Sequence, residues 1–180
     1  GLGALTYEII KLKPKKLIII EKDLFLFNEI QKKIDSKKII FLNKDALKYD
    51  YTHLVNYQII SNLPYNISSK FLLKIIKLNK NINEIVCMIQ SELAEKFDYN
   101  FGKMNKYKFI SEYCCEFEIL FNVSSNVFFP KPKVKSKVVK FKLKEKDINI
   151  NKLELFIKLF FVNKRKKIKS NKKFIDIIDK

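Results

Sequence analysis

Two patterns of apolar residues alternate along the first half of the chain. Short continuous apolar runs occupy residues 17–20, 39–42, 58–60 and 85–89. Runs of this length are typical of parallel strands that are covered on both faces. Between them, residues 24–34 and 71–78 carry apolar residues at three- and four-residue spacing with lysines opposite, as crossover helices do. The alternation predicts a doubly wound α/β sheet.

The second half of the chain begins with a different pattern. Residues 117–123 and 137–143 are typical of two antiparallel strands, and in the second of them apolar residues alternate with lysines. This alternation predicts one core face and one basic face. A polar linker to residue 151, an amphipathic helix at 152–162 and a basic run at 163–167 follow. We therefore predict one α/β domain over residues 1–145 and a short helical, basic segment over 146–180.

Length and charge limit the function. A chain of 180 residues can bury one core with a small appendage. Its 37 Lys and Arg against 19 Asp and Glu give a net charge of +18, which favours a polyanionic partner such as nucleic acid over an acidic protein. Arg165 is the only arginine, so an AT-rich genome accounts for part of the lysine excess. A basic run is also often no more than a solvated face.

Cysteine and histidine usage argues against a metal or disulfide framework. Cys87, Cys114 and Cys115 have no ligand spacing, and His53 is the only histidine. We expect these cysteines to be small buried apolar residues. No run of about 18 apolar residues occurs, so we expect a soluble intracellular protein without a membrane span.

Three short segments near the predicted strands have the residue types of a cofactor site. Gly1-Leu2-Gly3 precedes a helix-like segment, as in a glycine-rich turn that lets a ligand approach the backbone. Glu21 ends the second-strand pattern, where a carboxylate accepts the two ribose hydroxyls of an adenosine-containing cofactor. Asp45-Ala46 follows the next strand, where Asp can accept from the adenine amino group. Each is ordinary alone, but together they predict one crevice at the carboxyl ends of the strands.

Residues 61–69 carry the most specific chemistry. Asn62-Leu63-Pro64-Tyr65 follows the fourth strand pattern and precedes a helix that Ser68 or Ser69 would cap. The lone pair of adenine N6 is delocalised, but an Asn oxygen and a neighbouring carbonyl can accept both amino hydrogens and direct that lone pair at an electrophilic methyl. Tyr65 offers a stacking surface for an extruded base. A helix-capping turn with a buried Tyr is the alternative.

Asn62-Leu63-Pro64-Tyr65 resembles the fourth motif of the adenine-N6 methyltransferases, and the whole chain resembles the ribosomal RNA adenine dimethyltransferase family. Residues 1–6 match the end of the first motif, Glu21 the second and Asp45-Ala46 the third. Further matches are residues 89–96 to a Gln-x-Glu-Val-Ala helix start, 107–111 to Tyr-Gly-x-Leu-Ser, 128–136 to Phe-x-Pro-x-Pro-Lys-Val-x-Ser, and 164–167 to a basic RNA-facing start.

The resemblance implies a Rossmann-like class I methyltransferase fold over residues 1–145, with S-adenosyl-L-methionine as cofactor. It implies N6-dimethylation of two adjacent adenines near the 3′ end of small-subunit (16S-type) rRNA within a 30S-type particle. It also implies a monomer that needs no metal, in the cytoplasm of a bacterium or the matrix of an organelle. Direct displacement at a sulfonium methyl requires positioning and hydrogen bonds rather than a covalent enzyme intermediate.

The same resemblance assigns roles to residues. Those expected to contact the cofactor are Gly1, Gly3, Glu21, Asp45, Ala46 and Asn62. Those expected to act on the target base are Asn62 with the Leu63 and Pro64 carbonyls for the amino group, and Tyr65 with Phe128 as a sandwich. Those expected to bind RNA are Lys131, Lys133, Lys135, Lys164, Arg165, Lys166 and Lys167.

The sequence departs from the family pattern at four places. The strand of the first motif and an earlier Gln-Asn-Phe segment do not occur, so we expect an upstream segment and weak cofactor binding without it. Lys108 replaces the Gly of Tyr-Gly-x-Leu-Ser, Lys131 replaces a frequent proline, and the C-terminal helical part is short.

Two other functions remain open from the sequence. The large-subunit rRNA methyltransferases of macrolide resistance share the fourth motif, although residues 107–111 and 128–136 favour the small-subunit family. A binding protein on the same fold, either a ribosome-assembly factor or a mitochondrial transcription factor, is the alternative without catalysis.

Overall fold

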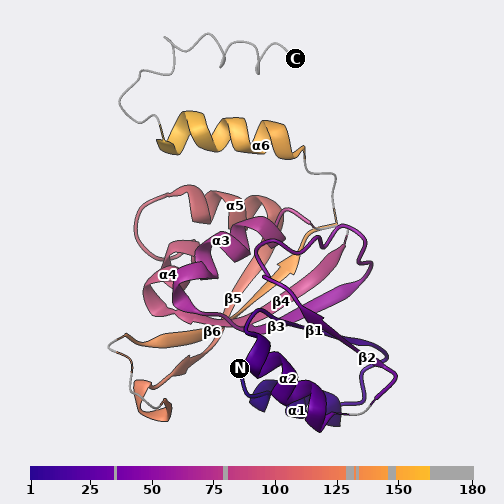
Figure 1. The fold of residues 1–180 in the computed structure, drawn as a ribbon. Helices are drawn as coiled ribbons and strands as arrows, with labels where there is room; N and C mark the ends of the chain where they lie inside the picture. The colour runs from indigo at the N-terminus through magenta and orange to yellow at the C-terminus, as the bar shows by residue number, and fades with distance from the viewer. Residues whose placement is uncertain (35, 79–80, 129–131, 133, 146–148, 163–180) are drawn as a thin grey trace.

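The computed structural model describes residues 1–180 except 35, 79–80, 129–131, 133, 146–148 and 163–180 (Figure 1). The elements in order are α1 (Ala4–Lys11), β1 (Leu17–Glu21), α2 (Leu24–Lys33), β2 (Ile39–Asn43), β3 (Tyr57–Asn62), α3 (Tyr65–Ile75), β4 (Ile82–Gln90), α4 (Ser91–Phe97), α5 (Lys106–Cys114), β5 (Cys115–Val123), the 3₁₀ turn η1 (Ser125–Val127), β6 (Ser136–Leu143), α6 (Ile150–Ile157) and the π-helical turn η2 (Lys158–Val162).

The strands form two hydrogen-bonded groups. β1 pairs with β2 in parallel, and a second group has the order β3-β4-β6-β5, in which β3 and β4 are parallel and β6 is antiparallel to both neighbours. Helices α3, α4 and α5 lie over one face with α6 beyond them, and α1 and α2 lie on the opposite side (Figure 1). This arrangement confirms the α/β class, the parallel first half and the antiparallel second half.

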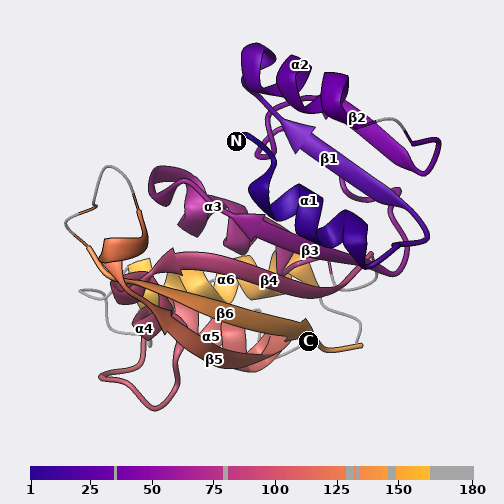
Figure 2. The same ribbon diagram turned by 90° about the horizontal axis from the view of Figure 1, so that it is seen from below.

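The parallel strands end on one side of the molecule. The arrowheads of β1, β3 and β4 point the same way in Figure 2, toward the side that also holds the chain's N-terminus, the start of α3 and the η1 turn. Residues that follow these strands are therefore brought to one edge, which is the arrangement that the sequence predicted for an α/β crevice.

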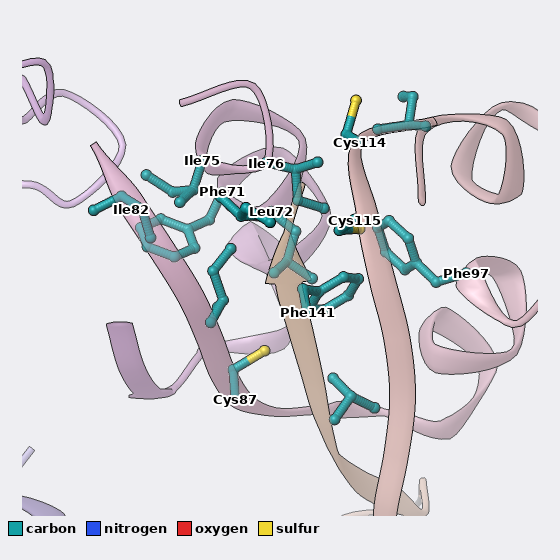
Figure 3. Packing of buried hydrophobic residues seen from close by; sticks show 14 of the residues in the cluster. Phe71, Leu72, Ile75, Ile76, Ile82, Cys87, Phe97, Cys114, Cys115 and Phe141 are labelled. Atoms are coloured by element: carbon teal, nitrogen blue, oxygen red, sulfur yellow. The ribbon is translucent and has the colours of Figure 1, made fainter. Parts of the chain in front are cut away.

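The core lies between the second strand group and its helices (Figure 3). Alternate residues of β4 and β6 point into it, among them Ile85, Ile89, Val139 and Phe141, each with no exposed surface. The ring of Phe97 from α4 meets Phe141 edge to face at 5.0 Å. This apolar layer fixes the sheet on which the candidate site is built.

β1 and β3 enclose a cavity instead of pairing with each other. Within the described residues, β1 is hydrogen-bonded only to β2, and β3 only to β4. The cavity between them has a volume of about 610 Å³, and its lining includes Ile18 and Ile20 of β1 and Ile59 of β3. Two strand edges therefore face a space lined largely by apolar side chains.

The start of α3 differs from the prediction. The helix begins at Tyr65, with Pro64 as its N-cap, and not near Phe71. Ser68 and Ser69 lie inside the helix, so the expected Ser cap is wrong. The Ser68 hydroxyl instead donates to the Pro64 carbonyl at 2.9 Å, as a Ser within a helix can do. Pro at a helix start needs no N–H partner, which permits the earlier start.

The predicted basic face of β6 is an ion-pair ladder. The antiparallel register places Lys142 opposite Glu116 and Lys140 opposite Glu118 on β5. Their charged groups approach to 3.8 Å and 2.5 Å respectively. The Glu118 carboxylate beside Lys140 raises the pKa of that ammonium. The positive charge of this face is therefore largely neutralised within the protein.

Candidate active site

Glu21 occupies the carboxyl end of β1, where the sequence predicted a ribose acceptor. Its Oε1 accepts the Asp23 N–H at 2.9 Å. Its Oε2 lies beside the backbone nitrogen of Gly1. The structure thus brings Gly1 and Glu21 together at the carboxyl end of β1.

Gly3 has a backbone conformation that favours glycine. Its φ is +88°, and a Cβ there would lie 3.1 Å from the Tyr7 ring and 3.4 Å from the Ile30 side chain. Gly3 also serves as the N-cap of α1. The positive φ and the close approach of Tyr7 and Ile30 therefore both favour glycine at this position.

Asp45 lies just beyond β2 and is connected to the Glu21 corner. The Asp45 carboxylate accepts the Leu47 N–H at 2.9 Å and pairs with Lys22 Nζ at 3.0 Å. These two contacts, the Leu47 amide first, hold its pKa below the usual range. Asn43 adds a second link, because its Nδ2 donates to the carbonyls of both Glu21 and Lys22. The predicted ribose and adenine acceptors therefore belong to one connected group.

A lysine of α3 holds the loop after Asp45 through hydrogen bonds to the loop's backbone. Lys74 Nζ donates to the Leu47 carbonyl at 2.9 Å and to the Tyr49 carbonyl at 2.6 Å. The Tyr51 hydroxyl donates to the Ala46 carbonyl at 3.0 Å, and its ring lies 5.2 Å from Lys74 Nζ. Burial raises the pKa of the Tyr51 hydroxyl, so it stays a donor at neutral pH. Lys74 and Tyr51 thus fix the backbone of the predicted adenine-binding loop.

Asn62 to Tyr65 form the turn from β3 into α3. Asn62 is the last residue of β3, exposed, and opposite Met88 of β4. Among the described residues none hydrogen-bonds its side-chain amide, so that amide is available to a ligand. Leu63 is buried at 5% exposure and anchors the turn. Tyr65 is half-buried, and its hydroxyl is 2.7 Å from Ser136 Oγ.

The Pro64 carbonyl is already engaged. It accepts from the amides of Ile67 and Ser68 and from the Ser68 hydroxyl. These three donors hold it inside the first turn of α3. The Leu63 carbonyl, one residue before, lies outside this helical network and is the better main-chain partner for an external amino group.

Phe128 follows η1, and it is half-buried with its N–H bonded to the Ser125 carbonyl at 3.4 Å. Lys135 is exposed, and its carbonyl accepts the Ser91 N–H. The other residues expected to bind RNA lie outside the described residues: Lys131, Lys133, Lys164, Arg165, Lys166 and Lys167. Their placement remains a prediction.

The cavity between β1 and β3 reaches this edge but also extends along both strands. Its lining includes Leu17 and Tyr57 at the starts of the strands, and Ala46, Ser61 and Leu63 near the carboxyl ends. The carboxylates along this edge fit S-adenosylmethionine, since they suit ribose hydroxyls. No cluster of three or more potential metal ligands occurs among the described residues.

Several residues of this site carry no sequence signal. Lys22, Asn43 and Lys74 sit in ordinary polar surroundings along the chain, and only the meeting of β1, β2 and α3 gives them partners. Ser136 lies 71 residues from Tyr65. A contact at that separation cannot be inferred from spacing alone.

The model of the ribosomal RNA adenine dimethylase family matches residues 1–176. The chain belongs to this family. It is 40% identical to the ribosomal RNA small subunit methyltransferase A of Malacoplasma penetrans over 96% of its length and 65% of the relative's. Identity to the protein of the same name from Ureaplasma parvum serovar 3 is 36%, over 95% and 66% of the two chains. The chain thus spans about two thirds of the length of these relatives.

Solved structures agree with this family membership. A dimethyladenosine transferase from Plasmodium falciparum superposes with a TM-score of 0.80 at 26% identity, covering 99% of this chain and 68% of that one. The 23S rRNA methyltransferase ErmE gives a TM-score of 0.73 at 20% identity over 88% and 65%, which shows the fold alone. The Rossmann-like class I methyltransferase fold is therefore confirmed for this member of the rRNA adenine dimethylase family. Among the described residues, no helix has the length and apolar character needed to cross a bilayer.

Proposed function

We propose that the protein dimethylates N6 of two adjacent adenines near the 3′ end of small-subunit rRNA, with S-adenosylmethionine as methyl donor. The observation that carries this proposal is the Asn62-Leu63-Pro64-Tyr65 turn at the carboxyl end of β3, with an exposed Asn62 side chain, in a member of the rRNA adenine dimethylase family. The names of its bacterial relatives support the small subunit as substrate.

The cofactor would lie along the edge from Gly1 to Asn62. The Glu21 carboxylate accepts from ribose hydroxyls, Gly1 and Gly3 let the backbone approach, and Asp45 with Ala46 borders the adenine. The bound cofactor supplies an electrophilic methyl on a sulfonium sulfur. Lys22 pairs with the Asp45 carboxylate. Its side chain is exposed, so a ligand can displace it at modest cost.

The target amino group would be held by Asn62 and the backbone. The Asn62 side-chain oxygen and the Leu63 carbonyl accept the two N6 hydrogens, which localises the nitrogen lone pair and directs it at the methyl. A C–N bond forms as the C–S bond breaks, and N6 then loses one proton to water. The hydrogen bond to Asn62 strengthens as positive charge develops on N6, so it acts on the rate.

The base itself would be held by aromatic rings. Tyr65 and Phe128 stack on the two faces of the extruded adenine, and the lysines of the Phe128 loop and of residues 164–167 contact phosphates. We infer that the protein acts as a monomer without a metal ion. It would act where small subunits are assembled.

The test is single-turnover methylation of undermethylated small subunits by the full-length protein at saturating cofactor. Asn62→Ala should lower the rate by about 10²–10³ while RNA and cofactor affinities change much less. Asn28→Ala, an exposed Asn on α2, is the matched control and should leave the rate unchanged.

Two results would contradict the proposal. Full activity of Asn62→Ala would remove the catalytic assignment and favour a binding protein on the same fold. Faster methylation of large-subunit rRNA than of small subunits would assign the protein to the macrolide-resistance type.

A further inference from the structure

The hydroxyl of Tyr65 has a specific partner. It lies 2.7 Å from the Ser136 Oγ, a normal distance for a hydrogen bond between hydroxyls. Ser136 is 1% exposed, whereas Tyr65 is half-buried at the first position of α3. The hydroxyl end of the Tyr65 ring is therefore fixed in the protein, while the side chain as a whole stays partly exposed.

Ser136 sits where both ends of the Phe128 loop meet. It is the first residue of β6 and lies opposite Val123, the last residue of β5, and opposite Gln90, the last of β4. The loop that carries Phe128 leaves β5 at Val123 and returns at Ser136. The Lys135 carbonyl, which accepts the Ser91 N–H at 2.9 Å, holds the returning stem against α4.

These contacts join two parts of the site that are far apart in the chain. Tyr65 belongs to the turn after β3, and Phe128 belongs to the connection between β5 and β6. Ser136 is bonded to the first and is the base of the second. Nothing else in the described structure hydrogen-bonds the Tyr65 hydroxyl, so this bond is the polar contact that fixes the hydroxyl end of the ring.

A stacking ring is effective only when its plane is fixed. A Tyr side chain at a helix start has two rotatable bonds, and each alternative rotamer turns its face away from the same base. A buried hydroxyl partner selects one orientation before the RNA arrives, and this lowers the entropy cost of capture. Removal of the partner leaves the ring in place but no longer prearranged.

We propose that Ser136 is a positioning residue for capture of the target base: it orients the Tyr65 ring and aligns it with the loop that carries Phe128. The inference rests on the proposed function, because it takes an extruded adenine as the ligand of Tyr65. It adds a role for the Tyr65 hydroxyl, which stacking alone does not require.

The experiment measures capture and chemistry separately in the full-length protein. A small-subunit rRNA fragment with 2-aminopurine at the target adenine reports base capture by its fluorescence, and single-turnover methylation of small subunits gives the apparent RNA affinity and the saturating rate. The variants are Ser136→Ala, Tyr65→Phe and the double substitution. The control is Tyr107→Phe, which removes the hydroxyl that meets Ser69 Oγ at 2.9 Å one turn further along α3.

Each single variant should weaken capture about five- to ten-fold, the effect of one lost hydrogen bond, with a smaller change in the saturating rate. The double variant should be no weaker than either single variant, because both remove the same bond. Tyr107→Phe should capture the base as the unsubstituted protein does, while its melting temperature falls by as much as that of the single variants.

Three outcomes would overturn the inference. Unchanged capture in both Ser136→Ala and Tyr65→Phe would show that the bond has no role. Additive losses in the double variant would show that the two hydroxyls act separately, and an equal loss of capture in Tyr107→Phe would indicate general loosening of α3. If the unsubstituted protein captures and methylates no small-subunit adenine, the proposed function itself fails, which separates the two results.

Discussion

Lys74 offers a quantitative test of how the adenine-binding loop is held. It lies on α3, half-buried, and its ammonium donates to the carbonyls of Leu47 and Tyr49. Lys74→Met gives a side chain of similar length and a residue of similar helix propensity. The substitution therefore removes the two hydrogen bonds and the charge while it leaves most of the packing.

The expected loss follows from those two bonds. A hydrogen bond from a charged donor contributes about 1.5–3 kcal/mol, and two bonds from one ammonium do not add fully. Partial exposure lets water reach some of the freed carbonyls and lowers the cost. We expect Lys74→Met to reduce the free energy of unfolding by about 2–4 kcal/mol. The lost contact with the Tyr51 ring would add about 0.5–1 kcal/mol at most.

Urea unfolding of the 180-residue chain measures this loss, with Lys70→Met as the matched control. Lys70 lies one turn earlier on the same helix and is exposed, so its substitution should change stability by no more than about 0.5 kcal/mol. Tyr51→Phe removes the single bond to the Ala46 carbonyl and should cost about 1 kcal/mol. If Lys74→Met and Lys70→Met unfold at the same urea concentration, the loop is not held by Lys74.

Three further predictions use other parts of the structure. Glu21→Ala in the full-length protein should weaken S-adenosylmethionine binding by roughly ten-fold or more in calorimetry. Glu29→Ala, which removes a partly exposed carboxylate on α2 that pairs with Lys32, should not; equal affinities would place the ribose elsewhere. Burial raises the pKa of the Cys87 and Cys115 thiols to about 12. At pH 8 their thiolate fraction is therefore about 10³-fold lower than that of an ordinary Cys. Mass spectrometry should find both thiols unlabelled by iodoacetamide in the folded protein and fully labelled in an unfolded sample. Amide hydrogen exchange should be at least about ten-fold faster in β1 and β2 than in β4 and β6 of this chain, because β1 and β2 contribute no buried residue whereas β4 and β6 carry buried residues along their length. Equal protection would show that the two strand groups unfold as one unit.

The fold was predictable where local pattern decides it. The continuous apolar runs of β1 and β4 and the alternation along β6 determine strand type, since burial on two faces or one face leaves different periodicities. The helix start at Tyr65 was missed because the apolar period begins later, at Phe71. Backbone geometry at Pro64, and not amphipathicity, sets that boundary.

The candidate site divides in the same way. Glu21, Asp45 and Asn62 could be found because each lies at or just beyond the carboxyl end of a strand, and parallel strands bring these ends together. The ion-pair ladder of β6 could not be found, because whether Lys140 meets a Glu depends on the register between β5 and β6. The burial of Lys108 could not be predicted either, because charge alone places a Lys on the surface. Its Nζ donates to the Gly102 carbonyl at 3.0 Å, and this hydrogen bond lets the side chain be buried at 1% exposure.

The ion pairs of β6 affect which lysines can bind RNA. Because Lys140, Lys142 and Lys137 already pair with Glu118, Glu116 and Glu95, their contact with phosphate would require breaking an ion pair. Lys135 is exposed and has no such partner in the described structure, and it stands beside Ser136 at the base of the Phe128 loop. The phosphate contacts nearest to the target base are therefore expected from this loop and not from the sheet face. The net charge of +18 alone does not distinguish the two surfaces, whereas the strand register does.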